Sequence, residues 1–506
     1  MLFNSYVFVV AFLPITVAGF YFAARLGGDR AATLWLIAAW VFFYGYWKLD
    51  YVPLLAAVMA FTFVAGRRLA VRPSKPLLAF SIVVVLGVLG YFKYAGFLLA
   101  NFAAATGGDY QLAHIVLPLA ISFFTFQKIA FLVDSQKGLT RGVKFLDFAL
   151  FVTFFPQLIA GPIVHWREMV PQFAAPGAFR PRAENFAVGL TIFIIGLCKK
   201  AVLADGIAAY ANPVFGAAAA GAHPDLVTAW GGALSYTLQL YFDFSGYSDM
   251  AIGAARLFGI VLPLNFNSPY KADNIIDFWR RWHMTLSRFL RDYLYIALGG
   301  NRRGTARRYL NLFATMLLGG LWHGAGWQFV LWGAVHGAYL AIDHAWRAVV
   351  PAAIAGARAY RFAAWALTFV VVVAAWVPFR ANNLASAGRI LAGMAGANGV
   401  ALPAAIAARL GALHAPLARL GVGFDLGGGA VLLLTWSWIA GLFALARFAP
   451  NTQELLGRFT PALDYAGGAR RFAWAPTGRW AWATAAVAVL GVLSLTRVSE
   501  FLYFQF

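Results

Sequence analysis

Long apolar segments recur along the whole chain and decide the environment in which it can fold. They lie at about 2–24, 31–46, 52–64, 77–91, 113–133, 146–164, 184–198, 229–242, 309–322, 327–342, 361–379, 429–447 and 479–495. A helix of about 20 such residues crosses the hydrocarbon core of a bilayer. Because lipid offers no hydrogen-bond partners, a spanning segment satisfies its backbone groups internally. We therefore predict an all-α integral membrane protein of roughly eleven to fourteen helices, some short, tilted or re-entrant.

Composition agrees with this environment. Of the 506 residues, 62% are hydrophobic and 12% are charged, whereas about one quarter of an average soluble domain is charged. The less hydrophobic connections, at about 165–183, 261–277, 380–428 and 450–478, are too short and too apolar to hold a separate core. We predict one polytopic membrane domain over 1–506. The first apolar run is not expected to be a cleaved signal, since no Lys or Arg precedes Arg25.

The formal charge of +21 is concentrated in segments that we interpret as short connections: Arg67–Arg68, Lys137–Lys144, Lys199–Lys200 and Arg280–Arg308. Positive residues in short loops mark the cytoplasmic side of a membrane protein, where they also face anionic lipid headgroups. We therefore expect a multi-pass protein of the bacterial inner membrane, without a nucleic-acid partner. Part of this charge is expected to meet an acidic thioester donor, coenzyme A or an acyl carrier protein.

The segment Leu317–Trp327 is the first candidate site. It places His323 in an almost wholly apolar stretch that also contains four glycines. An ionisable side chain is costly at membrane depth, which favours a functional role for this histidine. The glycines weaken a straight helix and allow backbones or a narrow substrate to approach closely. His323 is the leading catalytic candidate, and the flanking Trp322 and Trp327 are candidate substrate-binding residues.

The segment Tyr241–Asp249 is the second candidate site. It ends an apolar run and carries two carboxylates and two serine hydroxyls, of which Asp243 and Ser245 are candidates for substrate binding. In a helix, Asp243 and Tyr247 lie one turn apart on one face. The alternative, with about equal weight, is a polar helix end that caps a neighbour or pairs with an arginine of the basic segment.

The segment Phe278–Tyr293 is the third candidate site. Helical spacing gathers its aromatic residues and a histidine on one side: Trp279, Trp282, His283, Leu286 and Phe289. We expect a helix at the cytoplasmic interface with this side facing the core. His283 is a second catalytic candidate, and Trp279, Trp282 and Arg280 are candidates for substrate binding. The alternative is an aromatic-belt helix whose histidine only makes a structural hydrogen bond.

Other chemistries start with weaker support. The single cysteine, Cys198, and the absence of HExxH spacing among the histidines argue against a metal site. The chain also lacks a GxSxG nucleophile elbow. His336 and His344 are expected to make structural hydrogen bonds.

Several motifs together resemble the membrane-bound O-acyltransferases, in particular the bacterial branch that serves alginate O-acetylation. The resemblance rests on Phe278–His283, Leu290–Ile296, Leu298–Arg302, Gly319–Ala325, Gly161–Pro162, Lys199–Lys200 with Asp205, and both chain ends, Met1–Tyr6 and Phe501–Phe506. It implies a ring of helices around a central tunnel. It also implies that His323 is the catalytic histidine and that His283 lines the tunnel.

In this family setting, a donor on the cytoplasmic side meets an acceptor on the other side. A buried imidazole is neutral because desolvation penalises the cation, so His323 would act as a general base, an assistance of about 10²–10⁴-fold. His283 would orient or polarise the thioester, and backbone N–H groups near His323 would stabilise the oxyanion. The resemblance further implies acetyl export to an exopolysaccharide such as alginate, with an extracytoplasmic acetyltransferase partner and no bound cofactor.

The main rival is a transporter or flippase, because intramembrane Asp243, Asp249 and His323 also suit proton coupling. A third possibility is a non-catalytic scaffold for polysaccharide synthesis.

Overall fold

The computed structural model describes residues 1–506 except 111, 113, 114, 159, 160, 428, 466, 468–471, 497–501 and 503–506. Its first helices are α1 (Leu13–Lys48), α2 (Tyr51–Val71), α3 (Lys75–Leu89), α4 (Ala95–Thr106), α5 (Ile121–Gln136), α6 (Phe145–Thr153), α7 (Trp166–Phe173), α8 (Ala183–Cys198), α9 (Asp205–Ala219), α10 (Leu226–Leu257), α11 (Ile275–Arg281) and α12 (Met284–Phe289). The later ones are α13 (Thr305–His323), α14 (Trp327–Val349), α15 (Ala352–Gly356), α16 (Arg358–Arg380), α17 (Leu384–Met394), α18 (Ala404–Ala407), α19 (His414–Arg419), α20 (Gly429–Phe448), α21 (Thr452–Leu455) and α22 (Gly478–Leu493). Wider π-helical turns are η1 (Val7–Phe12), η2 (Gly90–Tyr94), η4 (Lys199–Ala204) and η6 (Leu290–Tyr295). The described residues also contain two short strands, β1 (Val400–Pro403) and β2 (Val422–Leu426). Because nearly all of the regular structure is helical, the predicted all-α class is confirmed.

Six helical stretches in the described part of the chain are long and apolar enough to cross a membrane: Val7–Lys48, Tyr51–Val71, Lys75–Thr106, Ala183–Ala219, Arg358–Arg380 and Gly429–Phe448. The first bends at Gly27 and Gly28, where the helical backbone is interrupted. The indole N–H of Trp35 donates to the Thr16 carbonyl at 2.9 Å, so the two arms pack side by side. The protein is therefore a multi-pass membrane protein, and the total number of crossings stays a prediction.

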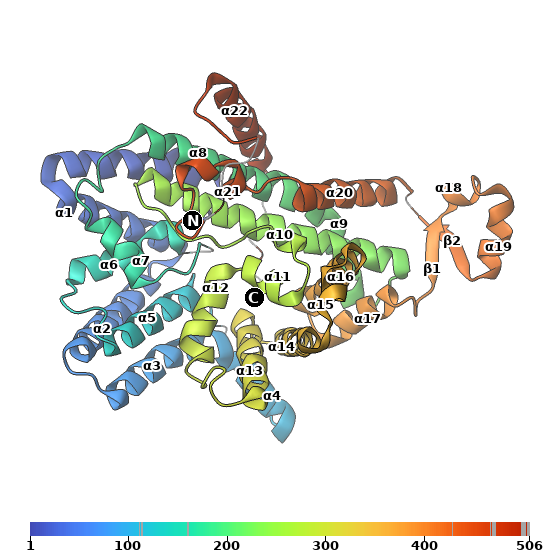
Figure 1. Cartoon of the computed structure of the whole chain (residues 1–506), viewed down its shortest axis with the longest axis horizontal. Coiled ribbons are helices and arrows are strands. Elements are labelled where there is room, and N and C mark those ends of the chain that lie inside the picture. The colour runs from blue at the N-terminus through green and yellow to red at the C-terminus, as the bar shows by residue number, and fades with distance from the viewer. Residues whose placement is uncertain are drawn as a thin grey trace.

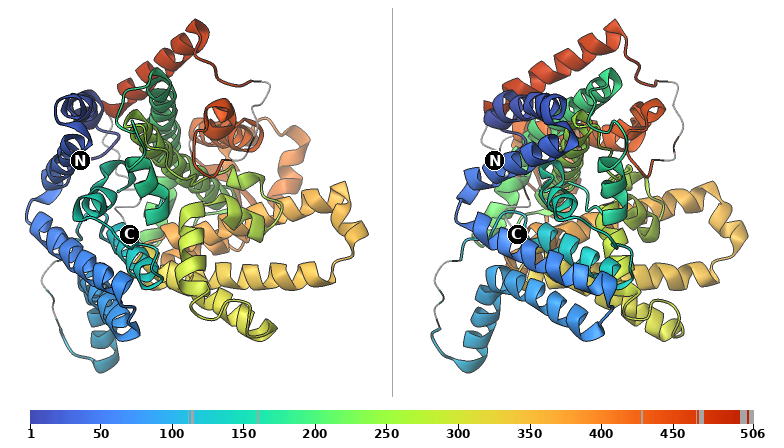
Figure 2. Two further views of the ribbon diagram at one scale, coloured as in Figure 1. Left: turned by 60° about the vertical axis from the view of Figure 1, so that its left-hand side comes forward. Right: turned by 90° about the vertical axis from the view of Figure 1, so that its left-hand side faces the viewer.

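Helix α10 runs through the middle of the molecule with α8 beside it (Figure 1). Figure 2 shows the N-terminal helices in blue and α13–α16 in yellow and orange grouped around this green centre. Glycines allow α8 and α10 to touch through their backbones. A Cβ atom at Gly196 would lie 2.5 Å from the Gly246 carbonyl oxygen, and one at Gly253 would lie 2.6 Å from that of Gly189. Such small-residue contacts are the usual basis of close helix packing in membranes.

The Lys199–Lys200 pair does not lie in a short connection, and that expectation is corrected. Both lysines belong to η4, inside the continuous helical stretch from α8 to α9. Lys199 pairs with Asp249 at 2.6 Å, while Lys200 pairs with Asp243 at 2.6 Å and with Asp205 at 2.8 Å. Asp243 also lies within α10 and not at its end, and its partner is a lysine, not an arginine. Charges inside an apolar bundle require such internal partners.

Helices α13 and α14 form a close hairpin. α13 ends at His323, the backbone is extended at Gly324 and Gly326, and α14 begins at Trp327. A Cβ atom at Gly333 would lie 2.4 Å from the Met316 carbonyl oxygen, so the two backbones are in contact. The glycine-rich stretch thus interrupts the helix directly after the histidine.

The segment Phe278–Tyr293 is not one helix, which corrects the prediction from its periodicity. α11 ends at Arg281, and His283 adopts a left-handed conformation with φ of 42° before α12 begins. The break is held by a segment distant in sequence, because the Met284 N–H donates to the Asn265 carbonyl at 2.9 Å and the Asn267 N–H to the Arg281 carbonyl at 2.9 Å. Left-handed backbone in a non-glycine residue costs about 1–3 kcal/mol. Hydrophobic spacing cannot report such a non-local constraint.

The connection 380–428 contains more structure than the sequence predicts. It includes α17 and a two-stranded parallel sheet in which Val400 pairs with Val422. With α18 and α19, this sheet projects from one end of the molecule (Figure 1).

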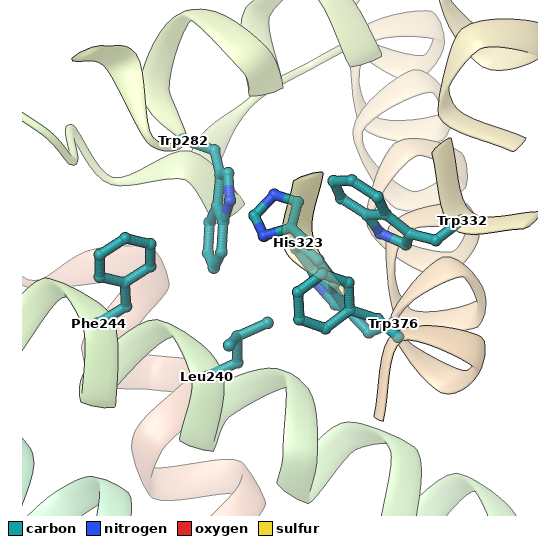
Figure 3. Close-up of a pocket in the computed structure, with 7 residues that line it drawn as sticks. Leu240, Phe244, Trp282, His323, Trp332 and Trp376 are labelled. Atoms are coloured by element: carbon teal, nitrogen blue, oxygen red, sulfur yellow. The ribbon is translucent and has the colours of Figure 1, made fainter. Parts of the chain in front are cut away.

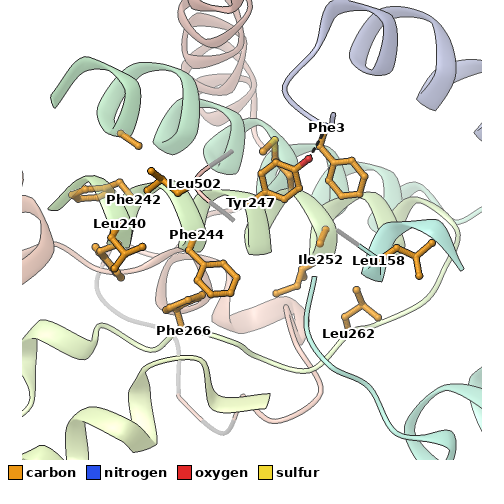
Figure 4. Packing of buried hydrophobic residues seen from close by; sticks show 14 of the residues in the cluster. Phe3, Leu158, Leu240, Phe242, Phe244, Tyr247, Ile252, Leu262, Phe266 and Leu502 are labelled. Atoms are coloured by element: carbon orange, nitrogen blue, oxygen red, sulfur yellow. Dashed lines mark hydrogen bonds between the residues drawn. The ribbon is translucent and has the colours of Figure 1, made fainter. Parts of the chain in front are cut away.

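Aromatic packing around α10 forms the core (Figure 4). At the chain's start, the ring of Phe3 stacks on Tyr247 at 5.1 Å, and its N–H donates to the Tyr247 hydroxyl at 2.9 Å. Leu502 is buried beside the same helix. The opening motif therefore contacts α10, whereas the closing motif, Leu502 aside, lies outside the described residues.

Candidate functional site

A narrow cavity lies where five helical segments meet. It is lined by Leu240 and Phe244 of α10, Trp282 after α11, His323 of α13, Trp332 of α14, and Trp376 and Phe379 of α16 (Figure 3). Of these seven side chains, the His323 imidazole is the one that can accept a proton near neutral pH. The remaining walls are apolar or aromatic, so the site favours a small, uncharged group.

Aromatic rings hold the His323 imidazole in place. The ring centroids of Trp322, Trp332 and Phe379 lie 4.8, 5.0 and 5.1 Å from that of His323. Figure 3 shows the imidazole between the rings of Trp282 and Trp332. Only 6% of the residue is exposed. This first catalytic candidate therefore faces an apolar cavity and does not face lipid.

Two residues of η2 fix the last turn of α13. The Lys93 ammonium donates to the carbonyls of Trp322 at 2.5 Å and His323 at 3.0 Å, and the Tyr94 hydroxyl donates to that of Leu321 at 2.8 Å. The last carbonyls of a helix lack intrahelical partners, and a cation there also complements the helix dipole. Lys93 was not among the residues predicted from the sequence. A lysine within a long apolar helix was the available signal.

His283 lies beside the cavity wall and is 1% exposed. Its ring is 4.8 Å from that of Phe244, which lines the cavity, and 6.4 Å from that of Trp322. The Nδ1 atom is 2.9 Å from Oδ1 of Asn265. The fold thus brings the two predicted histidines near one cavity. Asn265 gave no sequence signal, because it lies in a connection between helices that carries no recognisable motif.

Of the three predicted substrate-binding tryptophans nearby, Trp282 lines the cavity, with its ring 4.9 Å from that of Trp376. Trp322 stacks on Phe126 at 4.9 Å, next to His323. Trp279 does not line the cavity but packs against the lining residue Trp332. Its indole N–H donates to Nδ1 of His336 at 3.3 Å. The structural hydrogen bond expected for His336 is confirmed. His344 makes one too, with Arg308.

Four other substrate-binding candidates do not line this cavity, and a role for them in substrate binding stays a prediction. Asp243 and Ser245 are the neighbours of Phe244 on α10. Successive residues of a helix point about 100° apart. Because Phe244 points into the cavity, both polar side chains point in other directions. Asp243 is paired with Lys200. Arg280 is exposed at the surface. Trp327 is 55% exposed, and its indole donates to Asn101 at 2.9 Å.

The basic segment divides into paired and exposed arginines. In the described chain, four arginines have side-chain partners: Arg281 with Asp277, Arg288 with Glu168 and Asp464, Arg291 with Asp292, and Arg308 with His344. Arg302, Arg303 and Arg307 are exposed in and after the loop that precedes α13, and the described chain offers them no ion pair. These three remain available to an anionic ligand.

Comparisons with known proteins identify the family of the chain. The sequence model of the membrane-bound O-acyltransferase family matches residues 135–387. The chain is 44% identical to a peptidoglycan O-acetyltransferase of Helicobacter pylori, over 79% of this chain and 81% of that protein. It is 43% identical to a probable alginate O-acetylase of Pseudomonas aeruginosa, over 78% and 75% of the two chains. A teichoic acid D-alanyltransferase of Bacillus subtilis is 30% identical over 43% and 56%. The predicted resemblance is confirmed: the chain belongs to the membrane-bound O-acyltransferase family and is an acyltransferase.

Proposed function

We propose that this protein transfers acetyl groups from a cytoplasmic thioester across the bacterial inner membrane for O-acetylation of a surface exopolysaccharide, with His323 as general base. The observation that carries the proposal is the position of His323: it supplies the one proton acceptor in the wall of an apolar cavity. In that setting the imidazole is disfavoured as a cation and is suited to accept a proton from a hydroxyl group.

The chemistry follows from this placement. The acceptor hydroxyl gives its proton to His323 as its oxygen attacks the thioester carbonyl carbon. A C–O bond forms, the C–S bond breaks, and the departing thiolate takes the proton back from the imidazolium. The products are an ester and a free thiol. The aromatic walls exclude water, which would otherwise hydrolyse the thioester.

The exposed arginines support a donor that carries phosphates. Arg302 and Arg303 precede the helix that ends at His323, and Arg307 lies in its first turn. Guanidinium groups bind phosphates in a bidentate manner. We propose acetyl-coenzyme A or an acetylated carrier protein as the donor, with its phosphate or phosphopantetheine group at these residues.

The acceptor is proposed from the relatives. Their names refer to peptidoglycan, alginate and teichoic acid, three polymers of the cell surface. We favour an alginate-like exopolysaccharide, reached through an extracytoplasmic acetyltransferase partner. Peptidoglycan is the second candidate, because that relative is matched over 81% of its length.

The transporter alternative loses its main basis. Its proton-coupling residues included Asp243 and Asp249, and each carboxylate already has a lysine partner at 2.6 Å. Family membership also favours acyl transfer over transport.

The test measures transfer of labelled acetyl groups in membrane vesicles that contain the protein and a hydroxyl acceptor. We expect His323→Ala to lower the rate at least about 10²-fold, the usual contribution of a general base. His344→Ala is the matched control, because this histidine bonds to Arg308 away from the cavity, and it should retain transfer. Label that crosses the membrane without changing its covalent partner would establish transport instead. Mass spectrometry of the surface polymer, with and without the protein, then identifies the acceptor.

A further inference from the structure

A chain of hydrogen bonds reaches His283 from two backbone N–H groups. The Ile163 N–H donates to Oγ1 of Thr285 at 2.9 Å. The Thr285 hydroxyl accepts that bond and directs its own hydrogen to Oδ1 of Asn265, also at 2.9 Å. The Thr285 N–H points at the same Oδ1 from 3.5 Å. Backbone N–H groups can only donate, so Oγ1 of Thr285 and Oδ1 of Asn265 both accept from them.

These donors also determine the orientation of the Asn265 amide. If its oxygen and nitrogen were exchanged, the NH₂ group would face the N–H of Thr285, and two donors would oppose each other. Asn265 Oδ1 therefore stays toward Thr285, and it carries no hydrogen. Its contact with Nδ1 of His283, at 2.9 Å, forms only if Nδ1 supplies the hydrogen.

A neutral imidazole has one N–H group, so Nε2 of His283 carries a lone pair. Within the described chain this buried atom has no hydrogen-bond partner. The ring lies between Phe244, which lines the cavity, and Trp322, the neighbour of His323. An unpaired acceptor is thereby held close to the proposed reaction centre.

We propose that Asn265 and Thr285 are positioning residues that hold His283 as the Nδ1–H tautomer, so that Nε2 accepts a hydrogen bond from a hydroxyl group of the acyl acceptor. The identity of the group that meets Nε2 rests on the proposed function, whereas the tautomer rests on the hydrogen bonds alone. This assignment changes the role expected from the resemblance. A nitrogen without hydrogen cannot donate to a thioester carbonyl, so His283 orients the nucleophile and does not polarise the electrophile.

His336 provides an internal contrast. The indole N–H of Trp279 can only donate, so Nδ1 of His336 accepts, at 3.3 Å. The hydrogen of a neutral His336 ring then lies on Nε2. Two buried histidines near one cavity are thus expected to be opposite tautomers.

The test of the tautomer is ¹⁵N NMR of histidine-labelled protein in bilayers. His283→Gln and His336→Gln each remove one ring and so assign its signals. We expect the hydrogen of His283 on Nδ1 and that of His336 on Nε2. A hydrogen on Nε2 of His283 in the unaltered protein would overturn the proposal. This measurement needs no acyl donor, so its result is independent of whether acetyl transfer is the correct activity.

Variants then test the consequence for catalysis. Asn265→Leu removes the acceptor, so the His283 ring should no longer be held as the Nδ1–H tautomer and kcat should fall at least tenfold. In serine proteases, loss of the group that fixes the tautomer of the histidine costs about 10⁴-fold in kcat. Asn265→Asp keeps an acceptor oxygen, so it should retain the Nδ1–H signal and a higher rate than Asn265→Leu. Asn101→Leu, which alters an amide bonded to exposed Trp327, should leave the rate unchanged.

Thr285→Val covers the case in which Asn265→Leu does not fold, because it removes only the hydroxyl that directs the chain. It should weaken the preference for the Nδ1–H form and lower kcat. An unchanged kcat in His283→Gln, with acetyl transfer by the unaltered protein established, would overturn the catalytic part. If the unaltered protein transfers no acetyl group, the proposed function fails, and the NMR result still decides the tautomer.

Discussion

At the scale of single residues, the contact between Lys93 and the end of α13 links a distant segment of the chain directly to the backbone of the candidate base. The lysine lies about 230 positions before His323 in the sequence and bonds to its carbonyl at 3.0 Å. The ammonium group satisfies two carbonyls that a helix end leaves without partners. It therefore holds the turn that presents the imidazole to the cavity.

Lys93→Met should lower kcat by about 10–100-fold, because a misplacement of about 1 Å in a reacting group can cost 10²-fold. It should also lower the unfolding free energy by about 1–3 kcal/mol, the cost of buried carbonyls left without donors. The measurements are the initial rate of acetyl transfer and thermal unfolding in detergent. Lys75→Met, at an exposed lysine at the start of α3, is the control and should change neither. A Lys93→Met protein with the rate of the unaltered enzyme would show that α13 ends in the right place without this contact.

At the scale of elements, the hairpin of α13 and α14 depends on the absence of side chains where the two backbones touch. A Cβ atom at Gly333 would lie 2.4 Å from a carbonyl oxygen of α13 and 3.0 Å from the Cα atom of Leu317. Backbone atoms cannot rotate aside, so any added group must separate the helices. Since α13 carries His323 and α14 carries Trp332, that separation changes both the stability and the cavity.

Gly333→Ala should therefore lower the unfolding free energy by about 1–3 kcal/mol, as overpacking of a close-packed site does, and should reduce acetyl transfer in the protein that remains folded. Gly87→Ala is the matched control. This glycine lies within α3, and nothing lies within 4 Å of a Cβ atom there, so alanine should stabilise the helix by up to about 1 kcal/mol. Equal unfolding temperatures for the two variants would contradict the packing argument.

The same scale shows what could be predicted from the sequence. Apolar runs predicted the helical membrane class, and the glycines around His323 predicted an interruption there, because both signals are local. The break at His283 could not be predicted, since it depends on backbone hydrogen bonds with Asn265, which accepts from Met284, and with Asn267, which donates to Arg281. Periodicity placed Trp282 and His283 on the buried side but could not reveal that only the first lines the cavity. For Asp243 the sequence left substrate binding and ion pairing open, because it does not show that Lys200 lies opposite this carboxylate.

At the scale of the whole molecule, a network of buried charges connects segments from three parts of the chain. Asp249 of α10 accepts hydrogen bonds from Lys199 at 2.6 Å, from Thr452 at 2.6 Å and from Gln453 at 2.9 Å. A second ion pair joins Asp243, earlier in α10, to Lys200, the residue after Lys199. These contacts join η4, α10 and α21, whereas the cavity uses a different face of α10.

Asp243→Asn tests this separation of stability from catalysis. Removing one partner of a buried ion pair costs up to about 3–5 kcal/mol, and here the loss should be smaller than that, because Lys200 keeps Asp205 at 2.8 Å. The variant should unfold at a lower temperature, yet the folded protein should keep the KM for its thioester donor, since Asp243 faces away from the cavity. Asp273→Asn is the control: its pair with Arg361 is exposed and 3.4 Å long, so the loss should be about 0–1 kcal/mol. A raised KM without any loss of stability would instead show that Asp243 contacts the substrate. The aromatic cavity would then be only one part of the substrate-binding site.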